Sequence, residues 1–153
     1  LLLLVLGMVI VGIAVVAGIQ AFSEGRQKAA TDAAVSDALR IATDLQAWAM
    51  KPEAFGGGGG DLRKGNANVT FADLGYPQKG TNDAYGYAKD NIYITPNGCF
   101  ELTIDDATSV QATIDAYESY NGSTCDGTHY AQVQITGTDV GDVTTVVNPG
   151  SGS

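Results

Sequence analysis

The stretch LLLLVLGMVIVGIAVVAGIQAF, residues 1–22, decides the fold of this chain. It contains no charged residue, and Gln20 is its one clearly polar side chain. As an α-helix it would be about 33 Å long at ~1.5 Å per residue, enough to cross a hydrocarbon core of ~30 Å. A helix that is apolar all round cannot be solvated, so these residues predict an element buried in lipid or in other subunits.

Small residues recur inside this stretch. Gly7, Gly12 and Gly18 each cost about 1 kcal/mol of helix propensity relative to alanine in water. Ala14 and Gly18 are four residues apart, a spacing that lets two helix backbones approach closely. The pattern indicates close helix packing, and it is common in any membrane span.

The chain continues through residues 23–51 without a proline or a turn cluster, and its apolar residues become one-sided. Their spacings of four and three predict an amphipathic continuation of the same helix. The residues expected to pack on a sheet are Ala34, Ala38, Ile41, Leu45 and Trp48. The polar residues expected mostly on the opposite side are Asp32, Ser36, Arg40, Thr43, Asp44 and Gln46. Pro52 ends the helix, because the residue before a proline disfavours the helical region.

Residues 52–83 predict a loop region that contains the uninterrupted glycine run of residues 56–60. Such a run is typical of a flexible loop. A phosphate-binding loop is not predicted, because no Gly-Lys-Ser/Thr follows and no strand precedes the run.

Residues 84–147 predict an antiparallel sheet of about four to five strands. Residues 91–95 and 100–104 alternate around Pro96-Asn97-Gly98, which indicates a hairpin. Further period-two runs lie at residues 110–116, 133–135 and 143–147. With one face on the helix and the other in solvent, this sheet gives an α+β fold class, and residues 148–153 are expected to form a flexible tail.

The net charge of −9 belongs to the distal part of the chain. Residues 24–51 carry four acidic and four basic residues, whereas the part from Pro52 onward carries 17 − 4 = 13 acidic and 8 − 4 = 4 basic residues. A protein this acidic, without basic clusters, has no electrostatic footprint for nucleic acid or for anionic lipid. We therefore predict no nucleic-acid binding.

The residues offer little for catalysis or metal binding. His129 is the single histidine, and two cysteines with one histidine are too few for a zinc site. The spacing of Asp139 and Asp142 matches no calcium loop. We predict no enzyme activity, no metal and no cofactor.

Two cysteines and two sequons are candidates for covalent modification. If the apolar segment places the rest of the chain outside the cytoplasm, Cys99 and Cys125 most simply form one disulfide, two buried free thiols being the alternative. The triplets that begin at Asn68 and Asn121 match the glycosylation pattern Asn-x-Ser/Thr and would place sugars on an exposed surface.

The order of these segments resembles the type IV pilins and the related pseudopilins. The likeness covers the whole architecture, and residues 1–48 correspond to the long helix of that family. In the family a peptidase removes a leader, the apolar helix holds the subunit in the inner membrane, and the same helix then packs into the core of a helical filament. The resemblance implies copies of the chain itself, the membrane and an assembly machinery as partners, and a location at the cell surface. Cys99 and Cys125 fall where such proteins often staple their distal region.

Residues 1–22 would then be the assembly helix. Its candidate packing residues are Leu1, Leu4, Val5, Gly7, Gly12, Ala14, Gly18 and Phe22. Family members commonly begin with phenylalanine, carry glutamate at the fifth residue and have a proline near residue 22, whereas this chain has Leu1 and Val5 and lacks that proline. A lineage that assembles without the glutamate, a specialised subunit and a different mature start all fit this departure. Because the chain opens on leucine, we expect that a preceding segment is removed while the apolar segment is kept.

The main alternative is a membrane-anchored extracytoplasmic domain, or a pseudopilin of a secretion system, that forms no long surface filament. The same helix would then serve as a tether only. The unbroken passage from residues 1–22 into residues 23–51 favours assembly, because a tether would more usually include a flexible linker.

Overall fold

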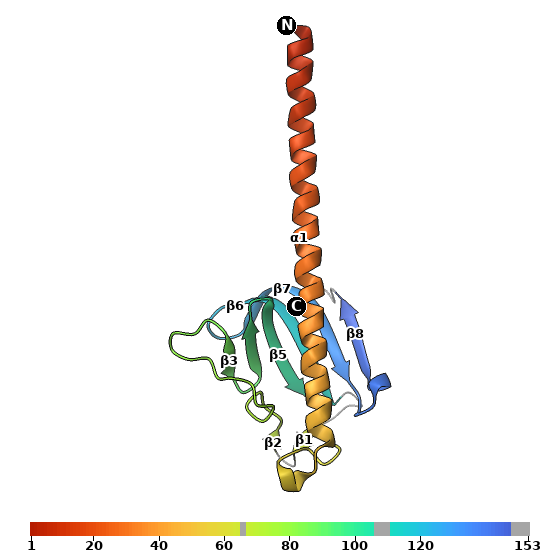
Figure 1. Cartoon of the computed structure of the whole chain (residues 1–153), viewed down its shortest axis with the longest axis vertical. Coiled ribbons are helices and arrows are strands. Elements are labelled where there is room, and N and C mark those ends of the chain that lie inside the picture. The colour runs from red at the N-terminus through yellow and green to blue at the C-terminus, as the bar shows by residue number, and fades with distance from the viewer. Residues whose placement is uncertain (65–66, 106–110, 148–153) are drawn as a thin grey trace. The chain divides into compact units, whose positions relative to one another are not determined.

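The computed structural model describes residues 1–64, 67–105 and 111–147 (Figure 1). Its helical elements are α1 (Leu2–Met50), η1 (Glu53–Phe55) and η2 (Val140–Asp142). Its strands are β1 (Arg63–Lys64), β2 (Ala67–Asn68), β3 (Gly86–Lys89), β4 (Ile92–Thr95), β5 (Gly98–Ile104), β6 (Ala112–Tyr120), β7 (Cys125–Ile135) and β8 (Val143–Val147). The predicted tail, residues 148–153, lies outside the described residues.

The chain divides into two compact units, Leu1–Asp32 and Ala33–Ser153. The first unit is the N-terminal part of α1. The second, which we call the head, contains the remainder of α1 and all of the strands. The predicted α+β class, with a long N-terminal helix whose second half packs on an antiparallel sheet, is confirmed.

The main sheet of the head has six antiparallel strands in the order β3-β4-β5-β6-β7-β8, so that every strand pairs with its neighbour in sequence. A separate two-stranded ladder joins β1 and β2. The prediction of four to five strands is therefore slightly low. The missing strand is β3, whose four residues Gly-Tyr-Ala-Lys bury only Gly86 and show no alternation.

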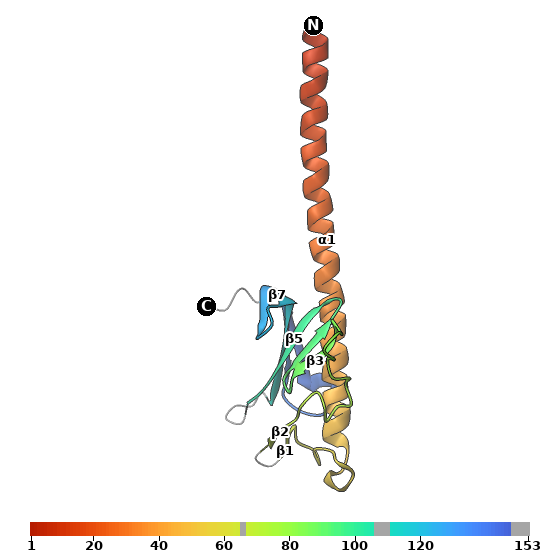
Figure 2. The ribbon, with the colours of Figure 1, turned by 90° about the vertical axis from the view of Figure 1, so that its left-hand side faces the viewer.

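One face of the sheet forms the core with residues 33–50 of α1, which lie along it (Figure 2). Ala34, Ala38, Ile41, Leu45 and Trp48 are all buried, with exposed fractions of 6% or less. Ala42 and Ala49 are completely buried beside them. Alanines at these positions let the helix backbone come close to the strands, where Phe100, Leu102, Ile114, Val133 and Ile135 supply the bulk of the core.

The opposite face of the sheet is not left entirely to solvent, contrary to the prediction. Ile92, Ile94 and Cys99 form a second buried cluster there, with Tyr117, Tyr120, Cys125 and Ala88 packed against it. The register explains the grouping, because Ile94 pairs with Cys99 and Cys99 pairs with Tyr117, and paired residues share a face. Two irregularities in the β6–β7 ladder, next to Tyr117, interrupt the regular pairing near the end of this hairpin.

Cys99 and Cys125 form a disulfide with a Cα–Cα distance of 5.5 Å. The bridge joins the start of β5 to the start of β7, across the intervening strand β6. It closes a loop with a sequence separation of 26 residues, which is worth about 3 kcal/mol on the chain-entropy model. The disulfide therefore holds the end of the β6–β7 hairpin next to the apolar cluster that contains Ile92 and Ile94.

Replacing both cysteines, in the variant Cys99→Ala/Cys125→Ala, should lower the free energy of unfolding of the head by about 3 kcal/mol. Denaturant unfolding of the full chain in detergent, followed by the fluorescence of Trp48, measures the change. Wild-type protein treated with a thiol-alkylating reagent without reductant should keep its mass. Two alkylated thiols, or equal unfolding midpoints, would contradict this assignment.

The glycine run of residues 56–60 caps the C-terminus of α1. The N–H groups of Gly58, Gly59 and Gly60 donate to the carbonyls of Trp48, Lys51 and Ala49 at 3.1, 3.0 and 2.6 Å. These carbonyls lie in or directly after the last helical turn, where no intrahelical partner is available. The run is the predicted loop, but its glycines have a specific task that the sequence did not reveal.

Two of these glycines lie where a side chain would not fit. A Cβ atom on Gly58 would overlap the Asp61 carbonyl oxygen and lie 2.7 Å from the Trp48 ring, and one on Gly57 would overlap the Lys51 carbonyl oxygen. Because backbone atoms cannot swing away as a flexible side chain can, the loop must move to admit a methyl group. The glycines are therefore required by close approach of the chain to the helix end.

Gly58→Ala should destabilise the head by at least ~2 kcal/mol, because it forces the cap away from Trp48 and Asp61. Gly141→Ala is the matched control, since no heavy atom lies within 4 Å of its Cβ position. The control should change stability by less than ~0.5 kcal/mol. Thermal unfolding of the two variants side by side tests the cap, and equal melting temperatures would refute it.

Candidate assembly surface

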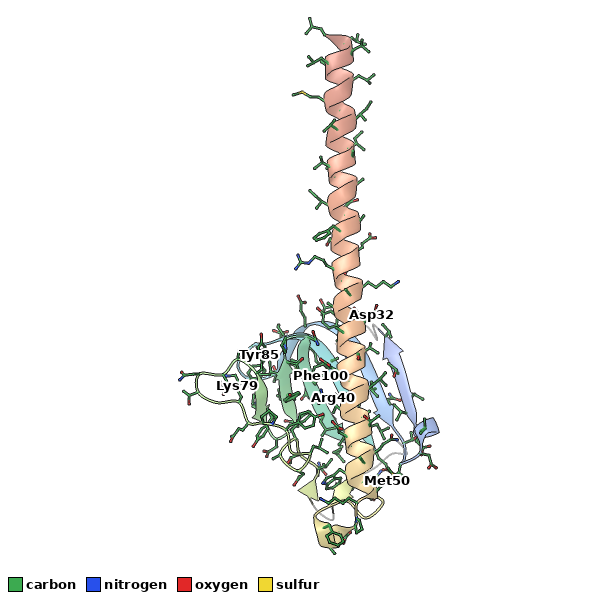
Figure 3. All side chains as sticks on the ribbon, in the orientation of Figure 1. Asp32, Arg40, Met50, Lys79, Tyr85 and Phe100 are labelled. Carbon is green, nitrogen blue, oxygen red and sulfur yellow. A yellow bond between two sulfur atoms is a disulfide. The ribbon has the colours of Figure 1, made fainter. Side chains whose placement is uncertain are left out.

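The apolar surface of residues 1–22 is uncovered. Its fifteen large apolar side chains are all more than half exposed, from 53% for Leu6 and Val9 to 104% for Leu1. They project from both sides of the helix as Figure 3 shows it, and no acidic residue lies in the first turn. Such a surface is stable only when another apolar phase or another protein covers it.

Among the described residues, α1 is the one helix long and apolar enough to cross a membrane. Core helices of soluble proteins and signal sequences can be equally long and apolar. No residue of the apolar window of α1 is buried, which sets it apart from the core helix of a soluble protein. The segment could anchor the chain in a membrane.

The predicted assembly residues do not share one face of the helix. At about 100° per residue, Gly7, Ala14 and Gly18 fall in a sector of about 40°, which Ala21 and Gly25 extend to about 60°. We call these five residues the small face. In contrast, Leu1, Val5 and Gly12 point to the opposite side, and Leu4 and Phe22 point between the two.

The small face is open in the monomer. No heavy atom lies within 4 Å of a Cβ placed on Gly7, Gly18 or Gly25. The glycines are therefore not required by any contact inside the described chain, although each weakens the helix in water. Gly25 was not predicted from the sequence, although it follows Gly18 by seven residues, the same spacing that separates Gly7 from Ala14.

A short charged segment follows the apolar one. Glu24, Arg26 and Lys28 are exposed, and the Arg26 guanidinium lies 6.0 Å from the centroid of the Phe22 ring. A cation–π contact of this kind contributes about 0.5–1 kcal/mol at an exposed site. The change from lipid-compatible to water-compatible surface thus occurs between Phe22 and Glu24.

Three polar residues of α1 join the helix to other segments of the head by hydrogen bonds, and one of them contradicts a prediction. Gln46 was expected on the polar side, yet it is only 7% exposed, and its Nε2 donates to the carbonyls of Gly137 and Asp139 at 3.1 and 2.9 Å. It lies four residues after Ala42 and three before Ala49, on the buried side of α1. Loop carbonyls that approach the helix need a donor, and glutamine supplies it.

The other two residues are aspartates. The Asn97 amide donates to Asp37 at 2.7 Å, and the Tyr76 hydroxyl donates to Asp44 at 2.5 Å. Burial and the Asp44 hydrogen bond raise the pKa of Tyr76 above its ordinary value. Tyr76 also packs edge-on against Phe71 and Tyr93, with ring centroids 5.5 and 4.7 Å apart. This aromatic cluster fixes the loop region of residues 52–83 to the helix.

The remaining candidates lie on the surface of the head. Asn68 ends β2 and is exposed, and Asn121 is exposed in the turn between β6 and β7, where its side-chain oxygen accepts from the N–H groups of Ser123 and Thr124. Over the described ranges, no group of three or more His, Cys, Asp or Glu side chains could hold a metal ion. His129 lies 3.0 Å from Asp115 and stacks on Tyr117, with ring centroids 4.5 Å apart.

These features define an α+β protein with a membrane-length apolar helix at its N-terminus and a disulfide-stapled antiparallel sheet, an arrangement compatible with a pilin fold. In comparisons with protein-family models, curated proteins and solved structures, the chain matches none of them.

Proposed function

We propose that this protein is the structural subunit, or pilin, of a type IV pilus-like extracellular filament. Residues 1–22 hold the subunit in the inner membrane before assembly and pack against copies of themselves afterwards. The observation that carries the proposal is the uncovered apolar surface of these residues, whose large side chains are all at least 53% exposed. In this function the protein is a structural subunit and not an enzyme.

The energetics favour a filament that is hard to dissociate. Enclosing residues 1–22 removes on the order of 1,000–2,000 Å² of apolar area from water, or tens of kcal/mol per subunit at ~25 cal/mol per Å², before entropy costs. Once the segment leaves lipid, only copies of a similar segment offer an equally dry environment. The membrane and the filament core are thus two alternative apolar environments for the same helix.

The small face supports helix packing as the final state. Between helices in lipid there is no hydrophobic driving force, so association depends on close backbone approach at small residues. Gly7, Ala14 and Gly18 provide such a face, on which a second helix can approach closely. The continuity of α1 from Leu2 to Met50 points the same way, because it leaves no linker between apolar segment and head.

A filament also requires contacts that propagate. Identical subunits form an open helix when one surface of each copy meets a different surface of the next. The small face and the opposite side of the helix, with Leu1, Val5 and Gly12, are two such different surfaces. Each copy can therefore bind two neighbours along its assembly helix.

A membrane-anchored extracytoplasmic domain, or a pseudopilin that forms no long filament, is the second candidate function. The lack of an acidic residue in residues 1–22 favours it, because the filament-forming pilins that this chain resembles commonly carry a carboxylate in this part of the helix. In that case the head works at the membrane surface and the apolar helix stays in lipid.

The experiment that separates the two functions is electron microscopy of surface material from cells that produce the chain, with antibodies against the head. The filament function requires labelled fibres that also form when purified full-length protein is freed of detergent. Deleting residues 1–22 should give a soluble monomer that cannot polymerise. Unlabelled cell surfaces, together with purified protein that fails to form fibres after detergent removal, would leave the anchored domain as the function.

Gly18→Leu should abolish or shorten the filaments, because its side chain keeps neighbouring backbones apart on the small face. Val15→Leu is the control: it enlarges an apolar side chain of the same segment that points between the small face and the opposite side of the helix. Both variants should insert into membranes equally, as membrane fractionation would show. If Gly18→Leu formed filaments of normal length and stability, the small face would not be the packing surface.

A further inference from the structure

The two edge strands of the main sheet, β3 and β8, differ in whether another segment covers their outer backbone groups. The β3 edge is covered by the segment that precedes it: the Tyr87 N–H donates to the Pro77 carbonyl at 2.9 Å, and the Lys79 N–H donates to the Tyr87 carbonyl at 3.0 Å. A parallel bridge between Gln78 and Tyr87 completes this cover. The β3 edge is therefore closed to a further strand.

The β8 edge is open. Over residues 1–64, 67–105 and 111–147, β8 is the last strand of the sheet and pairs with β7 alone. Its sequence Val-Thr-Thr-Val-Val consists of β-branched residues without a charge or a proline, and it pairs with β7 over five residues without a bulge. Lysine, proline and bulges are the usual protections of an exposed edge, and β8 has none of them.

Exposed apolar side chains gather at the same edge. Val146 and Val147 are 46% and 52% exposed, and Val140 in η2 is 93% exposed. The opposite flank offers a complement in Tyr85, which is 53% exposed beside β3. Figure 1 shows β3 and β8 on opposite flanks of the sheet, and Figure 3 places Tyr85 and Lys79 together on the β3 flank.

Charge distinguishes the flanks as well. The 13 acidic residues after residue 51 divide into five in residues 52–90 and eight in residues 91–153, whereas the four basic residues all lie in residues 52–90. Two of these, Lys79 and Lys89, flank the β3 edge, and the segment that leads into β8 carries the exposed Asp139. The charged residues that directly precede β8, Asp139 and Asp142, are both acidic, whereas the residues around β3 include two lysines as well as Asp83 and Asp90.

We propose that the β8 flank, defined by Asp139, Val140, Val146 and Val147, is the surface on which a second copy of this chain docks its β3 flank, defined by Lys79, Tyr85 and Lys89. The inference rests on the proposed filament, in which parallel copies meet side by side. A contact between different flanks propagates from copy to copy, whereas β8 paired with β8 would close as a dimer and stop. The contact covers the valines with an aromatic ring and brings lysines to the acidic flank.

Cysteine cross-linking in filaments of the full-length chain tests this contact. Thr81 and Thr145 are exposed, one on each flank, and Thr103 is exposed on the central strand β5. Under mild oxidation, Thr81→Cys/Thr145→Cys should give a ladder of covalent multimers on a non-reducing gel. Thr103→Cys/Thr145→Cys is the control and should give none. Dimers from Thr145→Cys alone, a ladder in the control, or no ladder in the test pair would overturn the proposal.

Val146→Lys should raise the protein concentration needed for assembly about tenfold, because it buries a charge at the β8 flank. Thr103→Lys adds the same charge to an exposed position away from both flanks and should leave that concentration unchanged. Equal concentrations for both variants would refute the docking surface while wild-type filaments still supported the proposed function. A wild-type chain that forms no filaments at all would overturn both.

Discussion

Residues 1–22, which belong to α1 from Leu2 onward, carry fifteen large apolar side chains that are each more than half exposed and that need an apolar cover. In the proposed function this helix passes from lipid into the filament core, and it has to stay folded on the way because each unpaired backbone group in lipid would cost several kcal/mol. Continuity of α1 down to Met50 meets that demand, because every peptide of the apolar segment stays inside one hydrogen-bonded helix.

The core between the second half of α1 and the sheet of the head is limited in size. Alanines on α1 let the helix lie close to the sheet, which limits how much apolar surface the contact can bury. Two smaller devices compensate: the aromatic cluster of Phe71, Tyr76 and Tyr93 on the helix side, and the disulfide between Cys99 and Cys125 on the other face. Disulfides are typical of small extracellular domains whose cores are limited in this way.

Periodicity was sufficient to predict α1, its buried side and most strands, because a 3.6-residue or two-residue repeat records which face is covered. It failed where a residue's role depends on a distant segment. Gln46 is buried because two carbonyls of residues 137–139 meet it, and Gly58 is required because Asp61 and Trp48 approach it. Neither partner is visible in a local window. Strand β3 escaped prediction because its pairing, and not its composition, makes it a strand. Residues 1–22 were predicted as one apolar helix, and their division into a small face and an opposite side follows from the ideal rotation of about 100° per residue, which applies to the sequence as well.

Residues 1–22 contain no charged side chain that could fix the register between neighbouring helices of the proposed filament. A buried ion pair would specify one axial position, since every other position leaves a charge unpaired in an apolar core. Without charges in residues 1–22, sliding one helix along another changes only how well shapes fit, and shape alone discriminates weakly among apolar side chains. Two features of this chain supply the missing specificity. Small residues placed seven, four and three apart admit a neighbour's bulky side chains only at matching heights. The charged segment that begins at Glu24 opposes any slide that would carry it into the apolar core, because burying its charges without partners is costly. In the proposed filament, contacts along the whole length of the helix thus set the register that an ion pair would set at one residue.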